Sequence, residues 1–528
     1  MVCRIINKNI DIYSYPNEFE DNLGSITLGD LHGNTIKLLH FLFRHQIITF
    51  KKEVLNVNDA YQKFVENYEL YGQLVQIYIK LHRGLHPIQD ELKVIQWRII
   101  KHLNNSPPHT AIDETKKNQE LTQLHQQMSV LAPQAKHYEE QLALLKGRFR
   151  SCIEGFNELM TMLDVNDNKT LSRLIGDEVG DRGNCDYFTL KIFDFLQKNN
   201  SQLVDIISNH GCELIYAYEQ FMDNLPFNAL GTVPSNQAVS FLGLKLLIEE
   251  EIIDNTELCR LIENSYKPNL KLIDYSLSEQ GITLFTHAPV EFDSIRLVAE
   301  HLGIVYADST KEALAGSIDK INLKIQEYAN KNILHTLFEN DLIIDKTNMS
   351  TDEKTYWPLI YFTWNRWKET KETDFARPAF KNGYSITYVH GHDSFQSKLL
   401  HVHNLDTLCG KESRAIKDKR IRQAQFIKRN PHTVTDRKKN EDYLENVSRY
   451  KVFDSDEQSL ERWQENKKAS TLPYDSIKKL SLLGGSAKAS VIQENKPLHV
   501  EKKKPAYSFE QQLSELSDIE FNNSRSLK

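Results

Sequence analysis

A short apolar run ends in an aspartate and a histidine within residues 25–34, Ser-Ile-Thr-Leu-Gly-Asp-Leu-His-Gly-Asn. The run predicts a buried strand, and Asp30 and His32 follow it two residues apart, on the same side of an extended chain. The neighbouring glycines allow a sharp turn there. One oxygen and one nitrogen ligand at a strand end make half of a divalent-metal site. Taken alone, such a pair is more often two ordinary loop residues, so the interpretation depends on the rest of the chain.

Four further segments place polar residues directly after short apolar runs. They are Gly176–Gly183, Ser208–Gly211, Leu284–Ala288 and Tyr388–Asp393. Strand ends that converge at one edge of a sheet are where α/β proteins build their sites. The sequence therefore predicts an α/β fold with a site assembled from the ends of several strands.

In this order the five segments resemble the motifs of the phosphoprotein phosphatase family of metallophosphoesterases: GDxHG, GDxVDRG, GNHE, a histidine of the HxG type, and GH. The resemblance covers residues 25–411 and is specific because five motifs recur in order, although each is short. It implies a calcineurin-like metallophosphoesterase β-sandwich flanked by helices. It also implies hydrolysis of phosphomonoesters on Ser/Thr or Tyr residues. Hydrolysis of dinucleoside polyphosphates or other small phosphoesters is the alternative, because it uses nearly the same motifs.

The resemblance implies a dinuclear metal centre. Asp30 and His32 would hold the first metal, and Asp177 would bridge the two ions. The second metal would be completed by Asn209, His287 and His392. All are oxygen or nitrogen donors without a thiolate, which favours two Mn²⁺ ions, with iron or zinc as alternatives. His392 is preferred to His390 because the family's final histidine follows a glycine.

The resemblance also implies the catalytic groups. His210 would be the general acid that protonates the leaving oxygen, held and charged by Asp181. Arg182 would grip the phosphate bidentately. Trp364-Asn365-Arg366 matches a tryptophan–arginine element of the family, so Arg366 is the candidate for a second arginine. The alternative for Arg366 is a surface arginine beside a core tryptophan.

Two positions depart from the family pattern. Gly180 is an extra residue between Val179 and Asp181, and Gly211 replaces a glutamate, although Glu213 follows two residues later. The extra glycine either bulges without moving Asp177 or misplaces Asp181 and Arg182. An alternative register with Gly180-Asp181 as the metal motif would lose the Asp-Arg-Gly element. A degenerate, inactive relative is a further alternative.

Residues 52–165 are inserted between the first two motifs and predict a helical hairpin. One apolar series runs at helical spacing from Tyr61 to Tyr78, and another continues at coiled-coil spacing from Leu121 to Leu163. Asn104–His109 is the expected turn, and Pro87 and Pro133 should kink or restart the helices. The coiled-coil hairpin is expected to be either a rigid decoration or a surface for a partner protein or a homodimer. The core should then fold without residues 55–163.

The remaining chain divides by composition. Residues 1–51 begin the phosphatase core and 166–411 complete it, with a helical cap at about 310–345. Residues 412–465 form a basic, helical region, and 466–528 a flexible tail. The acidic block 509–520 resembles a type IV secretion signal, a weak feature by itself. Together with the insertion and the altered second motif, it resembles the Wip-type effectors that Legionella delivers into host cells. That kinship implies a bacterial phosphatase acting on host phosphoproteins in the host cytoplasm.

Composition narrows the function classes. A formal net charge of −7 argues against nucleic acid as the main partner. The six cysteines include no CxxC pair, which indicates reduced thiols in a cytosolic setting. Neither a membrane span nor a Sec signal peptide is evident. A scaffold that recruits a partner through the hairpin, without catalysis, is the hypothesis from another class.

Overall fold

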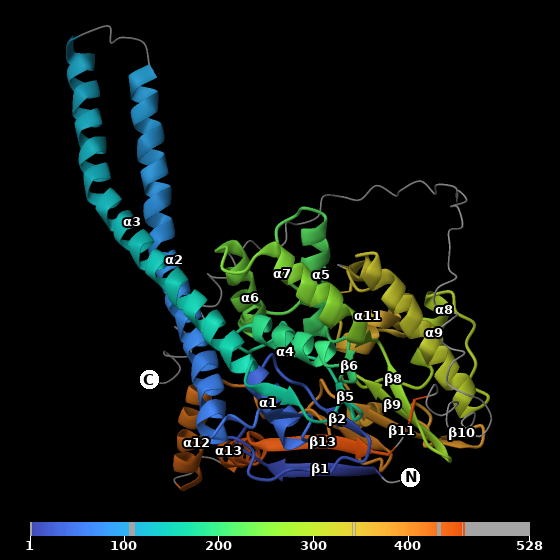
Figure 1. Cartoon of the computed structure of the whole chain (residues 1–528). Helices are drawn as coiled ribbons and strands as arrows, with labels where there is room; N and C mark the ends of the chain where they lie inside the picture. The colour runs from blue at the N-terminus through green and yellow to red at the C-terminus, as the bar shows by residue number, and fades with distance from the viewer. Residues whose placement is uncertain are drawn as a thin grey trace, which may run out of the picture.

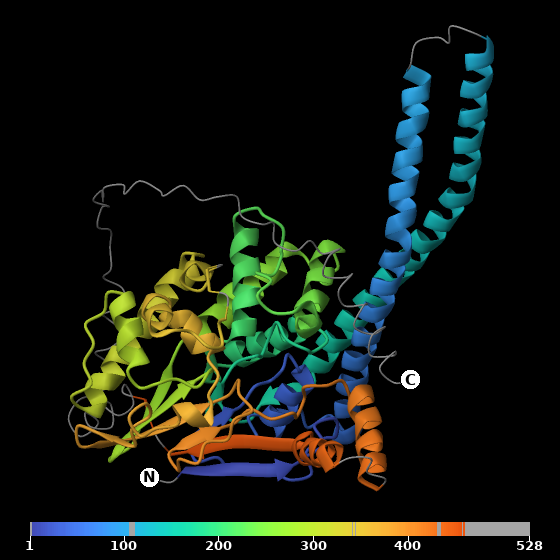
Figure 2. The same cartoon turned by 180° about the vertical axis from the view of Figure 1, so that it is seen from behind.

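The computed structural model describes residues 3–104, 111–340, 342–343, 345–429, 434–456 and 458–459. They form a mixed α/β body built on two main sheets, from which a long helical hairpin projects to one side (Figure 1 and Figure 2). The predicted flexible tail and its acidic block lie outside the described residues, as does most of the predicted turn between the hairpin helices. None of the helices in the described part of the chain combines the length and hydropathy that a membrane span requires. None of the six cysteines, all of which lie in the described part of the chain, forms a disulfide.

The larger sheet has six strands in the order β1-β13-β2-β5-β6-β7. From β2 to β7 neighbouring strands are parallel, whereas β13 runs antiparallel to both β1 and β2. Their bounds are β1 Cys3–Asn9, β13 Arg449–Ser455, β2 Ser25–Leu28, β5 Leu171–Leu174, β6 Leu203–Ile206 and β7 Leu270–Lys271. The parallel strands β2, β5 and β6 are the predicted strands that precede the first three motifs.

The second sheet contains the strands of the last two motifs. Its order is β10-β11-β9-β8, with β12 pairing parallel to β11, and β3 and β4 form a separate antiparallel pair. The bounds are β8 Asp274–Leu277, β9 Gly281–Thr286, β10 Phe380–Lys381, β11 Tyr384–His390, β12 Val402–Asn404, β3 Ile48–Phe50 and β4 Leu163–Val165. Because β9 and β11 are parallel neighbours, their carboxyl ends deliver the fourth and fifth motifs to the same edge.

Side chains of the two sheets pack against each other. Arg173 on β5 is fully buried and donates to the Asp274 carboxylate on β8 at 2.6 Å. Its guanidinium also lies 3.7 Å from the ring centroid of Phe285 on β9. A buried ion pair is weak evidence for stability but constrains which groups can face each other. The pair therefore helps to set the alignment of the two sheets.

Helices cover the body on several sides. The α-helices with bounds are α1 Thr35–Arg44, α2 Val57–Asn104, α3 Ala111–Met160, α4 Asp186–Lys198, α5 Asn209–Met222, α6 Val239–Glu249, α7 Asn255–Leu261, α8 Ser294–His301, α9 Lys311–Asn330, α10 Thr351–Tyr356, α11 Pro358–Trp364, α12 Arg414–Arg429 and α13 Val434–Asn446. Short turns of other helix types are η1 Ser235–Gln237, η2 Ile262–Tyr266, η3 Lys267–Asn269, η4 Leu334–Leu337 and η5 Glu369–Lys371. Of the region expected to form a cap at 310–345, α9 packs on β8 and the neighbouring strands, where Asn322 bonds the backbone of Leu272 and Ile273.

The prediction of a helical region over 412–465 is wrong at its C-terminal end. Helices α12 and α13 are followed by β13, which lies between β1 and β2 inside the larger sheet. Tyr450, Val452 and Phe453 on this strand are buried. Its apolar residues alternate with Arg449 and Lys451, so in composition this strand resembles the basic helices before it. The sequence therefore does not distinguish it from them. The core therefore extends beyond residue 411.

The base of the hairpin belongs to the main hydrophobic core. Tyr61, Tyr68 and Tyr71 of α2 are buried, and their hydroxyls donate to carbonyls of Ile12, Gly33 and Gly243 on the body. The aromatic series therefore faces the phosphatase body as well as α3. Each long helix also runs unbroken through its proline, Pro87 in α2 and Pro133 in α3. Of the two expected effects of these prolines, a kink or a restart, the restart is therefore wrong.

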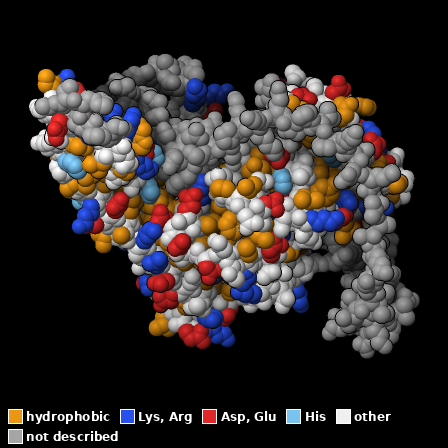
Figure 3. Space-filling view, turned by 90° about the horizontal axis from the view of Figure 1, so that it is seen from above, with side chains coloured by type: hydrophobic (Ala, Val, Ile, Leu, Met, Phe, Trp, Pro, Cys, Tyr) orange, Lys and Arg blue, Asp and Glu red, His pale blue; other side chains and the backbone are white. Residues whose placement is uncertain are grey.

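Distal parts of the hairpin carry exposed apolar side chains instead, among them Trp97, Ile100 and Leu103. Seen from above, hydrophobic side chains are mixed with Lys, Arg, Asp and Glu over the visible face of the molecule (Figure 3). The hairpin thus has an embedded base and a projecting end with different physical roles.

We expect the two parts to respond differently to deletion. Replacing residues 93–129 by a short glycine–serine linker should leave one cooperative thermal transition, because the described residues of this range, 93–104 and 111–129, lie outside the main core cluster. Contrary to the expectation from the sequence, removing residues 55–163 should abolish it, because the side chains of the body that pack on the base of α2 become exposed. Circular dichroism melting measures both. Cooperative unfolding of the larger deletion would show that the body folds without the hairpin base.

Candidate active site

Five strand ends deliver the predicted site residues to one place. β2 leads to Asp30 and His32, β5 leads to Asp177, and β9 leads to His287. Asn209 and His210 follow β6 at the start of α5, and His392 follows β11. The side chains named here are all buried. The arrangement gives a dense, water-poor cluster of carboxylates and imidazoles.

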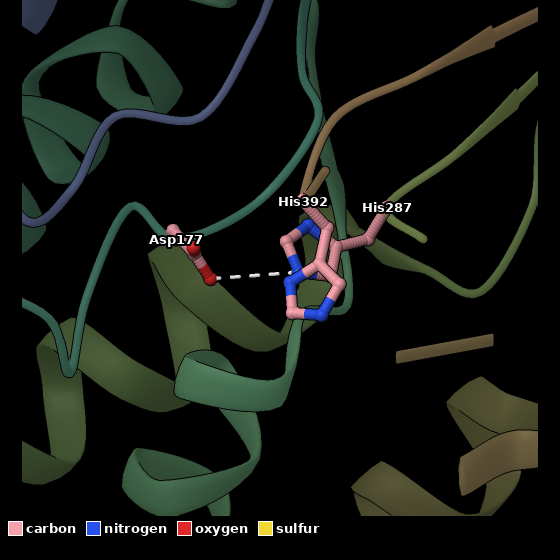
Figure 4. A group of neighbouring side chains, drawn as sticks. All are labelled: Asp177, His287 and His392. Carbon is pink, nitrogen blue, oxygen red and sulfur yellow. Dashed lines mark hydrogen bonds and ion pairs between the residues drawn. The ribbon is translucent and has the colours of Figure 1, made fainter. Parts of the chain in front are cut away.

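One group of possible metal ligands consists of Asp177, His287 and His392, whose ligand atoms lie within 4.8 Å of one another (Figure 4). His287 Nδ1 lies 2.7 Å from the Ile175 carbonyl oxygen, so Nδ1 donates its proton there and Nε2 presents a lone pair. That Nε2 is 3.6 Å from Asp177 Oδ1, 3.1 Å from His392 Nδ1 and 3.0 Å from Asn209 Oδ1. The backbone contact thus fixes the tautomer that a metal ligand requires.

A second group consists of Asp30, His32 and Asp406. Asp30 Oδ2 accepts the His392 backbone N–H at 2.9 Å, which ties the first motif to the last. His32 Nε2 lies 2.9 Å from the Thr407 carbonyl oxygen and 3.5 Å from Asp406 Oδ1. Sequence reasoning missed Asp406, although it follows the end of β12 as the other candidates follow their strands.

A third group joins the first two, since His32, Asp177 and Asp181 also lie within ligand distance of one another. Asp181 Oδ2 is 3.2 Å from His32 Nδ1. The two alternative alignments of the second motif use Asp177 or Asp181 as the metal ligand, and both carboxylates lie at the site. Asp177 faces the His287 group, and Asp181 faces His32.

Backbone conformation singles out three of these residues. His32, Asp177 and His392 have φ values of 57°, 52° and 59°, in the left-handed region that non-glycine residues seldom adopt. Such conformations cost free energy and occur where the surrounding structure over-determines them, often at functional sites. The three strained residues all lie in the cluster of possible metal ligands.

Hydrogen bonding indicates that the site suits cations. Among the described residues, four buried acceptors at the site have no hydrogen-bond donor: Asp30 Oδ1, Asp177 Oδ1, His392 Nε2 and Asp406 Oδ1. Burial, with Asp406 and Asp177 nearby, raises the pKa of Asp30 well above its usual range. Burial also lowers the pKa of His287, and that of His392 further still, so both imidazoles are neutral. Unpaired buried acceptors are costly, and divalent cations would satisfy them. The donor set therefore fits metal ions.

His210 is held by the extra glycine of the second motif. Its Nδ1 donates to the Gly180 carbonyl oxygen at 2.7 Å, whereas its Nε2 lies 3.6 Å from Asp181 Oδ1. Burial lowers the pKa of His210, but Asp181 and Asp177 outweigh it, so the net shift is upward. The short hydrogen bond to His210 is thus made by the carbonyl of the inserted residue, and Asp181 lies at ion-pair distance from the other ring nitrogen.

The inserted glycine is itself fixed in place. Gly180 has φ +70°, and a Cβ there would lie 2.5 Å from the His210 carbonyl oxygen, so only glycine fits. Its N–H donates to both oxygens of Asp186, at 3.0 and 3.1 Å. Glu213 does not enter the site. Its carboxylate accepts the backbone N–H groups of residues 231–233 and so orders that loop.

Both predicted arginines lie at the edge of the cluster. Arg182 donates to Asp181 Oδ1 at 2.7 Å, and its side chain is 26 % exposed. Arg366 donates to the His392 carbonyl oxygen at 2.7 Å. His390, by contrast, lies outside the three ligand groups, and burial lowers its pKa to about 3.

Comparison with known families identifies both parts of the chain. Residues 171–411 match the model of the WipA-like phosphatase domain, and residues 59–160 match the model of the WipA α-helical hairpin. Two parts of this chain thus match models of WipA-like proteins, one for the phosphatase domain and one for the helical hairpin. The WipA-like match covers the second to fifth motifs, and the hairpin match corresponds to α2 and α3. The chain is therefore a phosphatase enzyme.

Among solved structures, the WipA-like chain is similar to the phosphatase domain of the Legionella effector WipB. The two are 26% identical with a TM-score of 0.48, and the match covers 70% of this chain and 99% of that one. No curated protein gives a match.

Proposed function

We propose that this phosphatase is a metal-dependent phosphoprotein phosphatase with a dinuclear centre inside a calcineurin-like sandwich. The observation that best supports this proposal is the set of buried acceptors without a hydrogen-bond donor among the described residues. Some of them belong to the group around Asp177 and the others to the group around Asp30. Asp30, His32 and Asp406 would hold one ion; Asn209, His287 and His392 would hold the other, with Asp177 between them. Manganese is the favoured metal, because every donor is oxygen or nitrogen. Bound metals would supply a strong oxygen nucleophile at neutral pH and positive charge around the phosphoryl group.

Side chains of the protein would bind the phosphoryl group and protonate the leaving oxygen. Arg182 and Arg366 would bind phosphoryl oxygens as the charge on them grows. His210, whose Nε2 is the nitrogen left available by the Gly180 bond, would give its proton to the departing oxygen. Asp181 favours the protonated imidazolium at that position, because its carboxylate faces Nε2. The substrate would be a phosphorylated Ser, Thr or Tyr side chain.

A substrate panel tests this proposal. Initial rates should be measured on a pooled library of phosphoserine, phosphothreonine and phosphotyrosine peptides and on diadenosine tetraphosphate, with Mn²⁺ present. We expect the peptides to have the higher kcat/KM. A preference for the dinucleotide would favour a small-phosphoester hydrolase instead. A cellular effect that is lost when the hairpin is deleted but kept when Asp177 is replaced would favour the scaffold hypothesis.

We also propose that the exposed apolar end of the hairpin binds a partner protein or a second copy of the chain. Trp97, Ile100 and Leu103 support this, because clustered exposed apolar side chains often mark interfaces. Light scattering on the intact chain and on the variant lacking residues 93–129 tests self-association. If the intact chain is a monomer at every concentration, self-association is excluded and only binding of a different protein remains.

The destination of the enzyme is a further part of the proposal. Its sequence resemblance to Wip-type effectors favours delivery by a type IV system into a host cell, where it would act on host proteins. The acidic block 509–520 is the candidate signal. A translocation reporter fused to chains with and without that block tests it, and equal delivery would remove the block as the signal.

A further inference from the structure

A groove of about 510 Å³ has Arg182, at the edge of the catalytic cluster, among its lining residues. This volume falls within the range of ligand-binding clefts. One wall is the base of α2, including Glu69, Gln73 and Gln76. A second part of the lining comes from residues 411–416, which lead into the first turn of α12, and Asn184 and Asn236 also contribute. Both cartoon views place α12 beside the base of α2 (Figure 1 and Figure 2).

The walls of the groove are held in register with the catalytic residues. Asn184, two residues after Arg182, donates through its side-chain Nδ2 to the Tyr68 carbonyl oxygen on α2 at 2.8 Å, and its backbone N–H donates to Tyr68 Oη at 2.9 Å. A Cβ at Gly72 would lie 2.6 Å from the Asn184 side chain, so a glycine inside α2 permits this approach. On the third side, the Ser240 N–H at the start of α6 donates to the Asp181 carbonyl oxygen at 2.8 Å. The hairpin therefore sets the position of the loop that carries Arg182.

The lining offers polar groups that a ligand can reach. The side-chain amides of Gln73 and Asn236 are exposed, and Gln76 and Lys411 are half-buried. Side-chain amides can both donate and accept, which matches the alternating N–H and C=O groups of an extended polypeptide. A groove with this lining that includes Arg182, the arginine proposed to bind the phosphoryl group, suits a chain whose phosphorylated residue occupies the catalytic cluster.

We propose that this groove binds the stretch of polypeptide next to the phosphorylated residue, so that α2 of the hairpin and the start of α12 select the substrate. The proposal rests on the phosphatase function proposed above and deepens it. It gives the base of the hairpin a role in substrate recognition that the projecting end does not share. Binding of a nucleoside group in the same groove would instead assign the groove to a nucleotide substrate.

Filling the groove tests the proposal. Gln73→Trp and Gln76→Trp each place a large ring against the groove, and the exposed Gln127 on α3 supplies the matched control Gln127→Trp. The measured quantity is kcat/KM on the pooled phosphopeptide library divided by kcat/KM on para-nitrophenyl phosphate. We expect this ratio to fall about tenfold in both groove variants through KM, the size of one good interface contact, and to stay constant in the control. Equal thermal melting of all variants would exclude misfolding.

Three outcomes would overturn the proposal. They are an unchanged ratio, an equal loss on both substrates, and a selective loss on diadenosine tetraphosphate. Fluorescence anisotropy with the same labelled phosphopeptides, without added metal, separates this proposal from the phosphatase assignment. If the intact chain turns over no phosphoester but binds the peptides, and the groove variants do not, the groove assignment stands and the proposed reaction fails. Equal binding by all variants would contradict the groove assignment.

Discussion

Asp177→Asn is expected to remove most of the bound metal and nearly all turnover. Asp177 Oδ1 is buried without a hydrogen-bond donor in the described structure and lies 3.6 Å from His287 Nε2. The carboxylate also belongs to two of the three ligand groups, so one substitution weakens both proposed metal positions. Loss of supporting residues around metal sites already costs about 10–100-fold, and a shared ligand should cost more.

The comparison variant for this experiment is Asp223→Asn, which makes the same chemical change at an exposed position after α5. Metal content by mass spectrometry and turnover of para-nitrophenyl phosphate should be measured on the same preparations. The control should match the unaltered enzyme in both. Full activity of Asp177→Asn, with or without metal, would remove Asp177 from the centre.

His210→Ala should give the second largest effect, with a different pattern. We expect the metals to stay bound and turnover to fall by about a hundredfold to ten-thousandfold, the usual contribution of a general acid. The loss should be large for phosphoserine, whose leaving oxygen needs a proton, and small for para-nitrophenyl phosphate. His301→Ala, on α8, is the control.

The pH dependence provides a separate criterion for His210. Its pKa is raised above the usual value, so the protonated acid is present at low pH and is lost as pH rises through that pKa. The alkaline decline of kcat on phosphoserine should therefore disappear in His210→Ala. A variant that loses its metals, or keeps the same alkaline decline, would show that His210 is not the acid.

The strand-end motifs were predictable because their signal is local. An apolar run that stops at a polar residue locates Asp30, Asp177 and His287 without knowledge of the fold. Asp406 carries the same signal after β12, but its segment is none of the five motifs to which the resemblance assigns ligands, so the sequence does not single it out as one. The hydrogen bond from His210 to Gly180 could not be predicted, since it depends on where one inserted residue places its carbonyl.

Elements that depend on distant contacts were harder to predict. β13 pairs with strands more than 400 residues away in sequence, and no local pattern reports such partners. The aromatic series of α2 predicted a helix correctly. It did not reveal that Tyr68 and Tyr71 bond to the body and not only to α3. Helical periodicity shows which face is buried, but not against what.

The account depends most directly on two metal ions acting together. The chain should be stripped with a chelator and titrated with Mn²⁺, while bound metal per chain and turnover of para-nitrophenyl phosphate are followed in the same samples. The predicted result is no turnover in the metal-free chain and full turnover only when two ions are bound per chain. Full turnover without metal, or saturation of activity at one ion per chain, would contradict the account.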